Sequence, residues 1–347
     1  MITEHNILYT NAEYMDRLED CSVDLVVTSP PYPMIEMWDA MFEEMDPMTG
    51  RLLEAGLGKD AFERMHCVLD SVWDEVTRVL KPGGVCCINI GDATRSLGGS
   101  FSLYPSHYRI TEYFYRKDFY SLPNILWRKQ ANSPAKYMGS GMLPVGAYVT
   151  LEHEYILIFR KGSKKRGFKT AEEKANRNAS GFFWEERNQW FSDIWTDLKG
   201  VSQKLGGDSP RARSAAFPFE LAYRLINMYS VKGDMVLDPF LGTGTTCLAA
   251  AVAGRNSLGF EIACEFRPLI EEKMSDIVER GNICIKDRLK KHAAFVEQQK
   301  AAGREFKYFN GHYQTPVISK QEVEINLGTL VSCSPVQDTS FVLRYED

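Results

Sequence analysis

Hydrophobic positions along the chain follow two spacings, one typical of β-strands and one typical of α-helices. Short apolar runs predict strands at 6–10, 24–28, 85–90, 155–159, 235–237 and 257–260. Apolar residues three or four positions apart predict helices at 60–80 and 219–229, with further helical stretches ending near residues 20, 253 and 280. Strands that alternate with helices indicate an α/β fold with a doubly wound, parallel sheet.

Composition and charge narrow the class of protein. The 347 residues are 44% hydrophobic and 25% charged, which predicts a folded chain of about two domains or one large domain with insertions. The net charge of −5 excludes a globally polyanion-binding protein, so any nucleic-acid surface must be local. Eight cysteines include no C-x-x-C pair, and no secretory leader or membrane-length apolar run is present. We therefore expect reduced thiols in a soluble, cytoplasmic protein.

One segment departs from this charge balance. Eight Lys and Arg residues and only two Glu residues stand between positions 160 and 177, and aromatic residues follow as far as Trp195. This composition predicts an inserted, partly loop-like segment. The segment is either a phosphate-contacting surface or a solvated charged loop.

The sequence DPFLGTGTT, at 238–246, lies between a predicted strand and a predicted helix. Glycines there permit a tight turn and the close approach of a ligand at the carboxyl edge of the sheet. The turn has no lysine, so it is not a phosphate loop, and a nucleoside-type ligand is the better interpretation. Glu261, at the end of the next predicted strand, suits ribose hydroxyls. The alternatives are a purely structural turn and an exposed Glu261 near a helix start.

The sequence TSPPY, at 28–32, directly follows the predicted strand at 24–28. Its prolines leave carbonyl acceptors without competing amide donors, Ser29 adds another acceptor, and Tyr32 adds a flat ring. Such a loop can hold an exocyclic amino group while the ring stacks on the base. This arrangement suits methyl transfer to a conjugated amine, and a target base would have to leave the duplex to reach it.

These two motifs, in this order, resemble the amino-group DNA methyltransferases that use S-adenosylmethionine, in the β group with permuted motif order. The similarity covers about residues 6–280 and includes WDEVTRVLKPGG at 73–84, EHEYILIFR at 152–160 and Ala216-Phe217-Pro218. The resemblance implies a Rossmann-like, mostly parallel seven-stranded methyltransferase sheet with an inserted target recognition region. It also implies S-adenosylmethionine as the cofactor.

The resemblance assigns roles to named residues. It implies that the target base is held by Ser29, Pro30, Pro31 and Tyr32. The implied cofactor contacts are Asn11, Thr28, Phe217, Pro218, Asp238, Pro239, Phe240, Gly242, Thr243, Gly244, Thr245 and Glu261. Asn11 follows a threonine where the family usually has a Gly-Asp pair. DNA contacts are expected from Lys164, Lys165, Arg166, Lys169 and Arg177, with Asn188 and Gln189 able to reach base edges.

The resemblance also divides the chain. A catalytic part spans 1–160, a target recognition region 161–213 and a cofactor-binding catalytic part 214–281, and an extension without assigned chemistry spans 282–347. The expected partners are double-stranded DNA, a cognate restriction endonuclease and a second copy of the chain. We expect no membrane partner.

The serine of TSPPY stands where adenine enzymes usually carry aspartate, which resembles the N4-cytosine members. We therefore expect N4-methylcytosine in duplex DNA as the product. Adenine N6 methylation, an RNA or protein substrate, and a non-catalytic DNA-binding protein are the alternatives. A Pro-Cys pair for a covalent C5 mechanism does not occur, and the six histidines lack metal-ligand spacing. We expect no metal.

Overall fold

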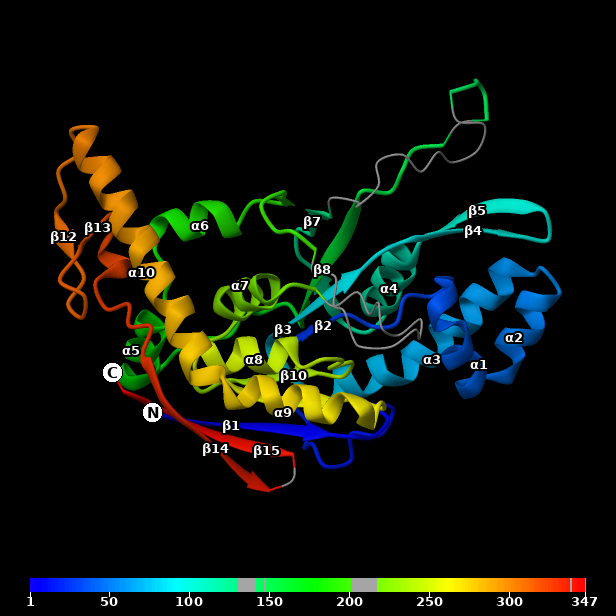
Figure 1. Ribbon diagram of the computed structural model, residues 1–347, viewed down its shortest axis with the longest axis horizontal. Helices are drawn as coiled ribbons and strands as arrows, with labels where there is room; N and C mark the ends of the chain where they lie inside the picture. The colour runs from blue at the N-terminus through cyan, green and yellow to red at the C-terminus, as the bar shows by residue number, and fades with distance from the viewer. Residues whose placement is uncertain (130–141, 147, 201–216, 338, 347) are drawn as a thin grey trace.

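The computed structural model describes residues 1–347 except 130–141, 147, 201–216, 338 and 347. Its centre is one sheet, which within the described residues has eleven strands in the order β14-β15-β1-β11-β10-β2-β3-β8-β7-β9, with β6 also paired to β8 (Figure 1). These strands are β1 (Ile2–Leu8), β2 (Val23–Thr28), β3 (Leu80–Ile90), β6 (Phe119–Ser121), β7 (Ile125–Arg128), β8 (His153–Lys161), β9 (Ile194–Trp195), β10 (Met235–Asp238), β11 (Asn256–Phe260), β14 (Thr329–Gln337) and β15 (Ser340–Glu346).

Parallel strands form the middle of the sheet. The run β1-β11-β10-β2-β3 is parallel, whereas β8 joins β3 and β15 joins β1 in antiparallel pairs. The α/β class and the parallel centre are therefore confirmed, but the sheet is wider than the expected seven strands. The added width includes β14 and β15 from the segment after residue 282. They bring the two termini together, where the Met1 amino group donates to the Tyr345 carbonyl at 3.1 Å (Figure 1).

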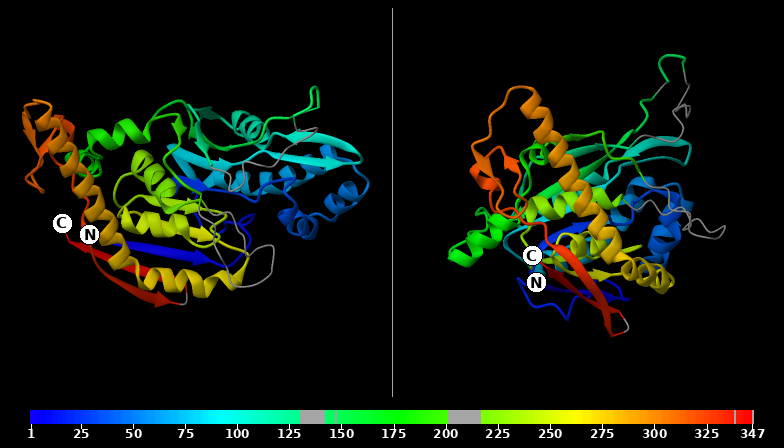
Figure 2. Two further views of the ribbon diagram at one scale, coloured as in Figure 1. Left: turned by 45° about the horizontal axis from the view of Figure 1, so that its top comes forward. Right: turned by 60° about the vertical axis from the view of Figure 1, so that its left-hand side comes forward.

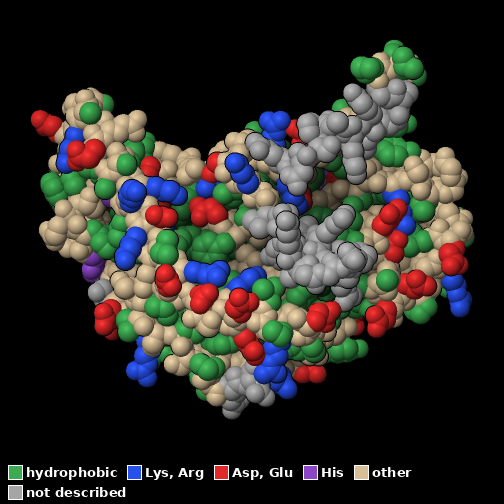
Figure 3. Space-filling model, in the orientation of Figure 1, with side chains coloured by type: hydrophobic (Ala, Val, Ile, Leu, Met, Phe, Trp, Pro, Cys, Tyr) green, Lys and Arg blue, Asp and Glu red, His purple; other side chains and the backbone are tan. Residues whose placement is uncertain are grey.

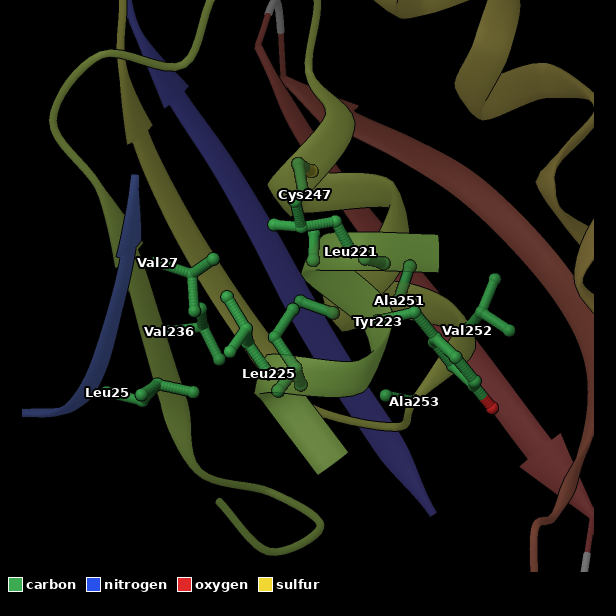
Figure 4. Close-up of a cluster of buried hydrophobic side chains, with 14 of the residues drawn as sticks. Leu25, Val27, Leu221, Tyr223, Leu225, Val236, Cys247, Ala251, Val252 and Ala253 are labelled. Carbon is green, nitrogen blue, oxygen red and sulfur yellow. The ribbon is translucent and has the colours of Figure 1, made fainter. Parts of the chain in front are cut away.

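Helices cover both faces of the sheet (Figure 2). Leu25, Val27 and Val236 pack against α7 and α8 in one core cluster (Figure 4), and the alternate residue Val26 packs on the α3 side. The α-helices are α1 (Asp39–Met45), α2 (Pro47–Glu54), α3 (Gly58–Val79), α4 (Ser106–Tyr115), α5 (Ala171–Ala179), α6 (Trp184–Trp190), α7 (Phe219–Tyr229), α8 (Thr245–Val252), α9 (Arg267–Ser275) and α10 (Ile277–Ala301).

Two predicted helices differ from the structure. The stretch from 11 to 20 forms turns, because the Arg78 guanidinium of α3 binds the Met15 and Leu18 carbonyls, and Glu75 accepts the Met15 amide. Side chains of α3 thus replace the hydrogen bonds that a helix would make with itself. The expected helix to residue 280 is two helices, α9 and α10, separated at Asp276, and α10 continues to Ala301.

Two small hairpins lie outside the main sheet. They are β4 (Ala93–Leu97) with β5 (Ser100–Tyr104), and β12 (Tyr308–Phe309) with β13 (Pro316–Val317). In the view of Figure 3, Lys and Arg side chains are interspersed with Asp and Glu side chains. No helix among the described residues combines the length and the apolar composition that a membrane span requires.

Candidate functional site

The two sequence motifs meet at the carboxyl edge of the parallel strands. Strand β2 ends at Thr28 and its parallel neighbour β10 ends at Asp238, so the chain leaves both strands at the same edge. The Thr28 hydroxyl donates to Asp238 Oδ1 at 2.6 Å. This bond joins segments that are 210 positions apart in the sequence.

Asp238 is a structural link between these segments. It is 2% exposed and accepts three hydrogen bonds from neutral donors, namely the hydroxyls of Thr28 and Thr246, each at 2.6 Å, and the amide of Phe240 at 3.0 Å. Burial raises the pKa of Asp238 to about 6, although these hydrogen bonds limit the rise. Its carboxylate lies behind the wall of the adjoining cavity, and its hydrogen bonds hold the two motifs together.

A cavity of about 340 Å³ opens between the motifs. Its serine side consists of residues 29–32 and Glu154, and its glycine side consists of residues 239–243, 260–263 and Thr245. The apolar remainder of the wall includes Ile35, Met37, Trp38, Met41, Met45, Val68, Leu69 and Val72. An apolar cavity with a few convergent polar groups is typical of a small-molecule site.

The glycine turn leaves room for a ligand. Gly242 has φ +55°, and a Cβ added there would meet no atom within 4 Å. The Glu261 carboxylate accepts the amides of Gly242 at 2.7 Å and Ala263 at 2.8 Å, and burial raises the pKa of this group. Each carboxylate oxygen keeps a second lone pair, so Glu261 can also accept hydroxyl groups of a ribose.

A hydrogen-bond network lies on the serine side. The Ser29 hydroxyl donates to Tyr32 Oη at 3.2 Å, and Tyr32 Oη donates to Glu154 Oε2 at 2.9 Å. Asn89 Nδ2 donates to both Tyr32 Oη and Glu154 Oε2 at 2.8 Å. Lys129 Nζ forms an ion pair with Glu154 Oε1 at 2.8 Å. The hydroxyl groups of the motif are therefore connected to a buried, paired carboxylate.

The structure brings together twelve of the predicted site residues as lining of one cavity. They are Ser29, Pro30, Pro31, Tyr32, Asn11, Phe217, Pro239, Phe240, Gly242, Thr243, Thr245 and Glu261. Thr28 and Asp238 support the wall from behind. A Cβ at Gly244 would approach Ile270 to 3.2 Å, so this glycine serves close packing. Pro218 lines a second cavity, of about 630 Å³, between α6, α7, α8 and α10.

The predicted DNA contacts lie elsewhere. Arg166 forms ion pairs with Asp234 at 2.6 Å and Asp24 at 3.2 Å, at the beginnings of β10 and β2. This is the amino edge of the sheet, and a six-residue strand places it about 17 Å from the carboxyl edge. The same segment includes Lys164, Lys165 and Lys169, which are exposed, and Arg177, which lies over the Phe168 ring. The structure does not bring this set to the cavity.

Sequence reasoning missed three residues of the serine-side network: Asn89, Lys129 and Glu154. Asn89 and Glu154 are polar residues in the buried strands β3 and β8, and that interruption of an apolar run is the signal that marks them. Lys129 follows β7 without a comparable signal. Among the described residues, no cluster of three or more His, Cys, Asp or Glu side chains could hold a metal ion.

Comparisons with known proteins agree with this geometry. The family N6_N4_Mtase, described as DNA methylase, matches residues 23–272. The Type II methyltransferase M.MthZI of Methanothermobacter thermautotrophicus is 49% identical, and the alignment covers all of this chain and 96% of the relative. M.MjaI of Methanocaldococcus jannaschii is 50% identical over 78% of this chain and 91% of its own length.

Solved structures share the fold. TTHA0409 of Thermus thermophilus, a DNA modification methylase by name, was solved with S-adenosyl-L-methionine; it is 32% identical with a TM-score of 0.60 over 79% of this chain and 94% of its own. The cytosine-N4-specific PvuII DNA methyltransferase aligns over 80% of this chain and 93% of its own, with a TM-score of 0.54. At 17% identity that match supports the fold alone.

The glycine side fits the nucleoside part of S-adenosylmethionine, because Gly242 leaves open space beside the cavity and Glu261 presents acceptors next to it. The serine side fits a base that carries an amino group, because the Ser29 hydroxyl and the Tyr32 ring line the same cavity. The chain therefore belongs to the N6_N4 DNA methylase family and is an S-adenosylmethionine-dependent DNA methyltransferase.

Proposed function

We propose that the protein methylates the N4 amino group of cytosine in duplex DNA. The observation that carries this proposal is the position of Ser29, which lines the same cavity as the glycine turn, with Tyr32 beside it. The serine form of the motif resembles the N4-cytosine members of the family. A hydroxyl in place of a carboxylate gives the pocket a neutral acceptor for an amino hydrogen.

The residues on the serine side would act mainly by orienting the base. Ser29 Oγ accepts one amino hydrogen, which favours the tetrahedral nitrogen of the transition state over the planar ground state. The Tyr32 ring stacks on the flipped cytosine, and Pro30 and Pro31 add acceptors without competing donors. On the glycine side of the cavity, Glu261 would bind the ribose of S-adenosylmethionine, which supplies an electrophilic methyl group when it is bound.

The relatives named Type II methyltransferases support a role in restriction and modification, with a restriction endonuclease that cuts the same sequence. Residues 161–213 are the proposed target recognition region, between the catalytic parts 1–160 and 214–281. A homodimer is also part of this proposal and is testable by analytical ultracentrifugation.

The experiment is incubation of the purified protein with unmethylated duplex DNA and methyl-labelled S-adenosylmethionine, followed by mass spectrometry of the nucleosides. Labelled N4-methyldeoxycytidine is the expected product. Labelled N6-methyldeoxyadenosine would still show methyl transfer to an amino group, but it would overturn cytosine as the target base. No labelled nucleoside, with cofactor binding intact, would overturn DNA as the substrate; RNA and peptide are then tested in the same assay.

A matched pair of variants connects the activity to the motif. Ser29→Ala removes the acceptor beyond the carboxyl end of β2, and we expect methylation to fall at least 100-fold with cofactor affinity unchanged. Ser22→Ala makes the same substitution just before β2, where the hydroxyl bonds only the Glu19 carbonyl, and we expect no change. Equal activity of the two variants would exclude Ser29 from the reaction.

A further inference from the structure

A directed chain of hydrogen bonds runs from Ser29 along the serine side of the cavity. Ser29 Oγ donates to Tyr32 Oη at 3.2 Å, and Tyr32 Oη donates to Glu154 Oε2 at 2.9 Å. Both hydrogens point along the chain toward the carboxylate. An amino group that donates to Ser29 Oγ would extend the chain by one more bond in the same direction.

Glu154 is suited to receive a proton at the end of this chain. Its side chain is 11% exposed, and its Oε1 is occupied by Lys129 Nζ at 2.8 Å. Oε2 faces Tyr32 and is the oxygen that would take the proton.

Tyr32 is suited to relay a proton: it can donate its own hydrogen to one neighbour while it accepts a hydrogen from another. Its hydroxyl donates to Glu154 and accepts from Ser29 and from Asn89 Nδ2, so its position is fixed from three sides. Burial and the charge of Glu154 raise the pKa of Tyr32 well above its usual value. The phenol therefore stays neutral and gives up its own hydrogen only as it receives another.

We propose that Glu154 is the proton acceptor of the methyl transfer, reached through Ser29 and Tyr32; this inference rests on the proposed function. The amino nitrogen forms a bond to the methyl carbon, and the carbon–sulfur bond breaks with its electrons going to sulfur. As the nitrogen–carbon bond forms, the nitrogen gives one hydrogen to Ser29 Oγ, Ser29 gives its own to Tyr32 Oη, and Tyr32 gives its own to Glu154 Oε2. The carboxylate becomes a neutral acid, and both hydroxyls are regenerated.

The first test is Tyr32→Phe, which keeps the ring and removes the middle of the chain. We expect the single-turnover rate to fall about 100-fold and the solvent deuterium isotope effect to disappear, with cofactor affinity unchanged. The control, Tyr155→Phe, removes a hydroxyl from the neighbouring strand position outside the network and should retain both the rate and the isotope effect.

The second test separates proton acceptance from positioning. Glu154→Gln keeps the shape of the side chain and an oxygen that can accept the Tyr32 hydroxyl, but it removes the carboxylate that takes the proton. We therefore expect it to lose both the single-turnover rate and the solvent deuterium isotope effect, as Tyr32→Phe does. Glu154→Asp shortens the side chain but keeps a carboxylate, and we expect a lower rate with the isotope effect retained. A lower rate with an unchanged isotope effect in both variants would make Glu154 a positioning residue and overturn its role as the acceptor.

Two results would overturn the proposal and are distinguishable. If the wild type methylates DNA but Tyr32→Phe keeps its rate and isotope effect, the proton leaves by another route and the proposed function stands. If the wild type produces no methylated nucleoside, the proposed function fails, and the proton relay fails with it.

Discussion

The two ends of the parallel strands β2 and β10 carry different kinds of polar chemistry. At the amino edge, the carboxylates of Asp24 and Asp234 are paired with the cations Lys81 and Arg166. At the carboxyl edge, Asp238 is held by hydroxyls and an amide, all neutral donors. At the amino edge, the charged groups form ion pairs with one another within the protein. At the carboxyl edge, the polar groups border a cavity.

This difference shows why local charge is a poor guide to a binding surface. The basic segment after residue 160 is the most cationic part of the sequence, yet Arg166 is used to compensate two buried carboxylates. The groups that can recognise a nucleoside are uncharged or singly charged and lie where neighbouring parallel strands end. Position relative to the sheet, and not charge density, distinguishes the two edges.

Among the changes that compare the two edges, the largest expected effect is on the affinity for the cofactor. Glu261→Gln replaces one acceptor oxygen with a donor, so one of the amides of Gly242 and Ala263 loses its partner and a ribose hydroxyl loses its acceptor. We expect S-adenosylmethionine to bind about 10- to 100-fold more weakly, or about 1.5–3 kcal/mol, by titration calorimetry. Glu272→Gln, on the exposed surface of α9, is the control and should bind normally. Equal affinities of Glu261→Gln and Glu272→Gln would show that Glu261 does not contact the cofactor.

The next effect is a pH dependence of stability at Asp238. Its pKa is about 6 in the folded protein against 3.8 for the free side chain, so the folded state favours the protonated form. Stability is therefore lost as pH rises from about 4 to 6 and stays lost above that range. In Asp238→Asn, the Thr28 and Phe240 bonds are kept, and Thr246 can turn to the Val27 carbonyl, 3.3 Å away.

Urea unfolding of the wild type and Asp238→Asn at pH 5 and pH 8 measures this effect. We expect the wild type to lose about 1–2 kcal/mol relative to the variant over that interval. If the two proteins differ in unfolding free energy by the same amount at both pH values, burial does not raise the pKa of Asp238.

The third effect is at the amino edge. Arg166→Met leaves the buried carboxylates of Asp234 and Asp24 close together without their shared cation. We expect a loss of about 1–2 kcal/mol at pH 7, less than for a fully buried pair because the Arg166 side chain is 40% exposed. The loss grows as pH rises, because burial and the charge of Asp24 already raise the pKa of Asp234 and Arg166 opposes that rise.

The fold was predictable where local periodicity decides it. Helix α7 has the expected bounds of 219–229, and the strands that end in the two motifs lie where the apolar runs place them. Long-range pairing was not predictable: β15 joins β1 across most of the chain, and side chains of α3 hold the turns at 11–20. Neither contact leaves a periodic signal in the residues that make it.

The candidate site also has a part that the sequence predicts and a part that it does not. Residues 29–32 and most of the glycine turn line the cavity as expected, because a motif at the end of a strand is positioned by that strand. Glu154 reaches Tyr32 only because β8 runs antiparallel beside β3, a pairing that the sequence pattern does not specify. For the same reason, the side of the sheet on which Asp238 presents its carboxylate was not predictable.

The smallest expected effect tests the amino edge as a DNA surface. Lys164 and Lys165 are exposed, and the backbone of their loop packs on Gly83 just before the apolar part of β3. If DNA enters at the carboxyl edge, the double variant Lys164→Ala/Lys165→Ala keeps its affinity within about twofold, because neither side chain reaches a phosphate. The measurement is DNA binding across a range of salt concentrations. A salt dependence reduced by about two ions would instead place the duplex against both edges of the sheet, and the cations of residues 160–177 would then serve DNA as well as the fold.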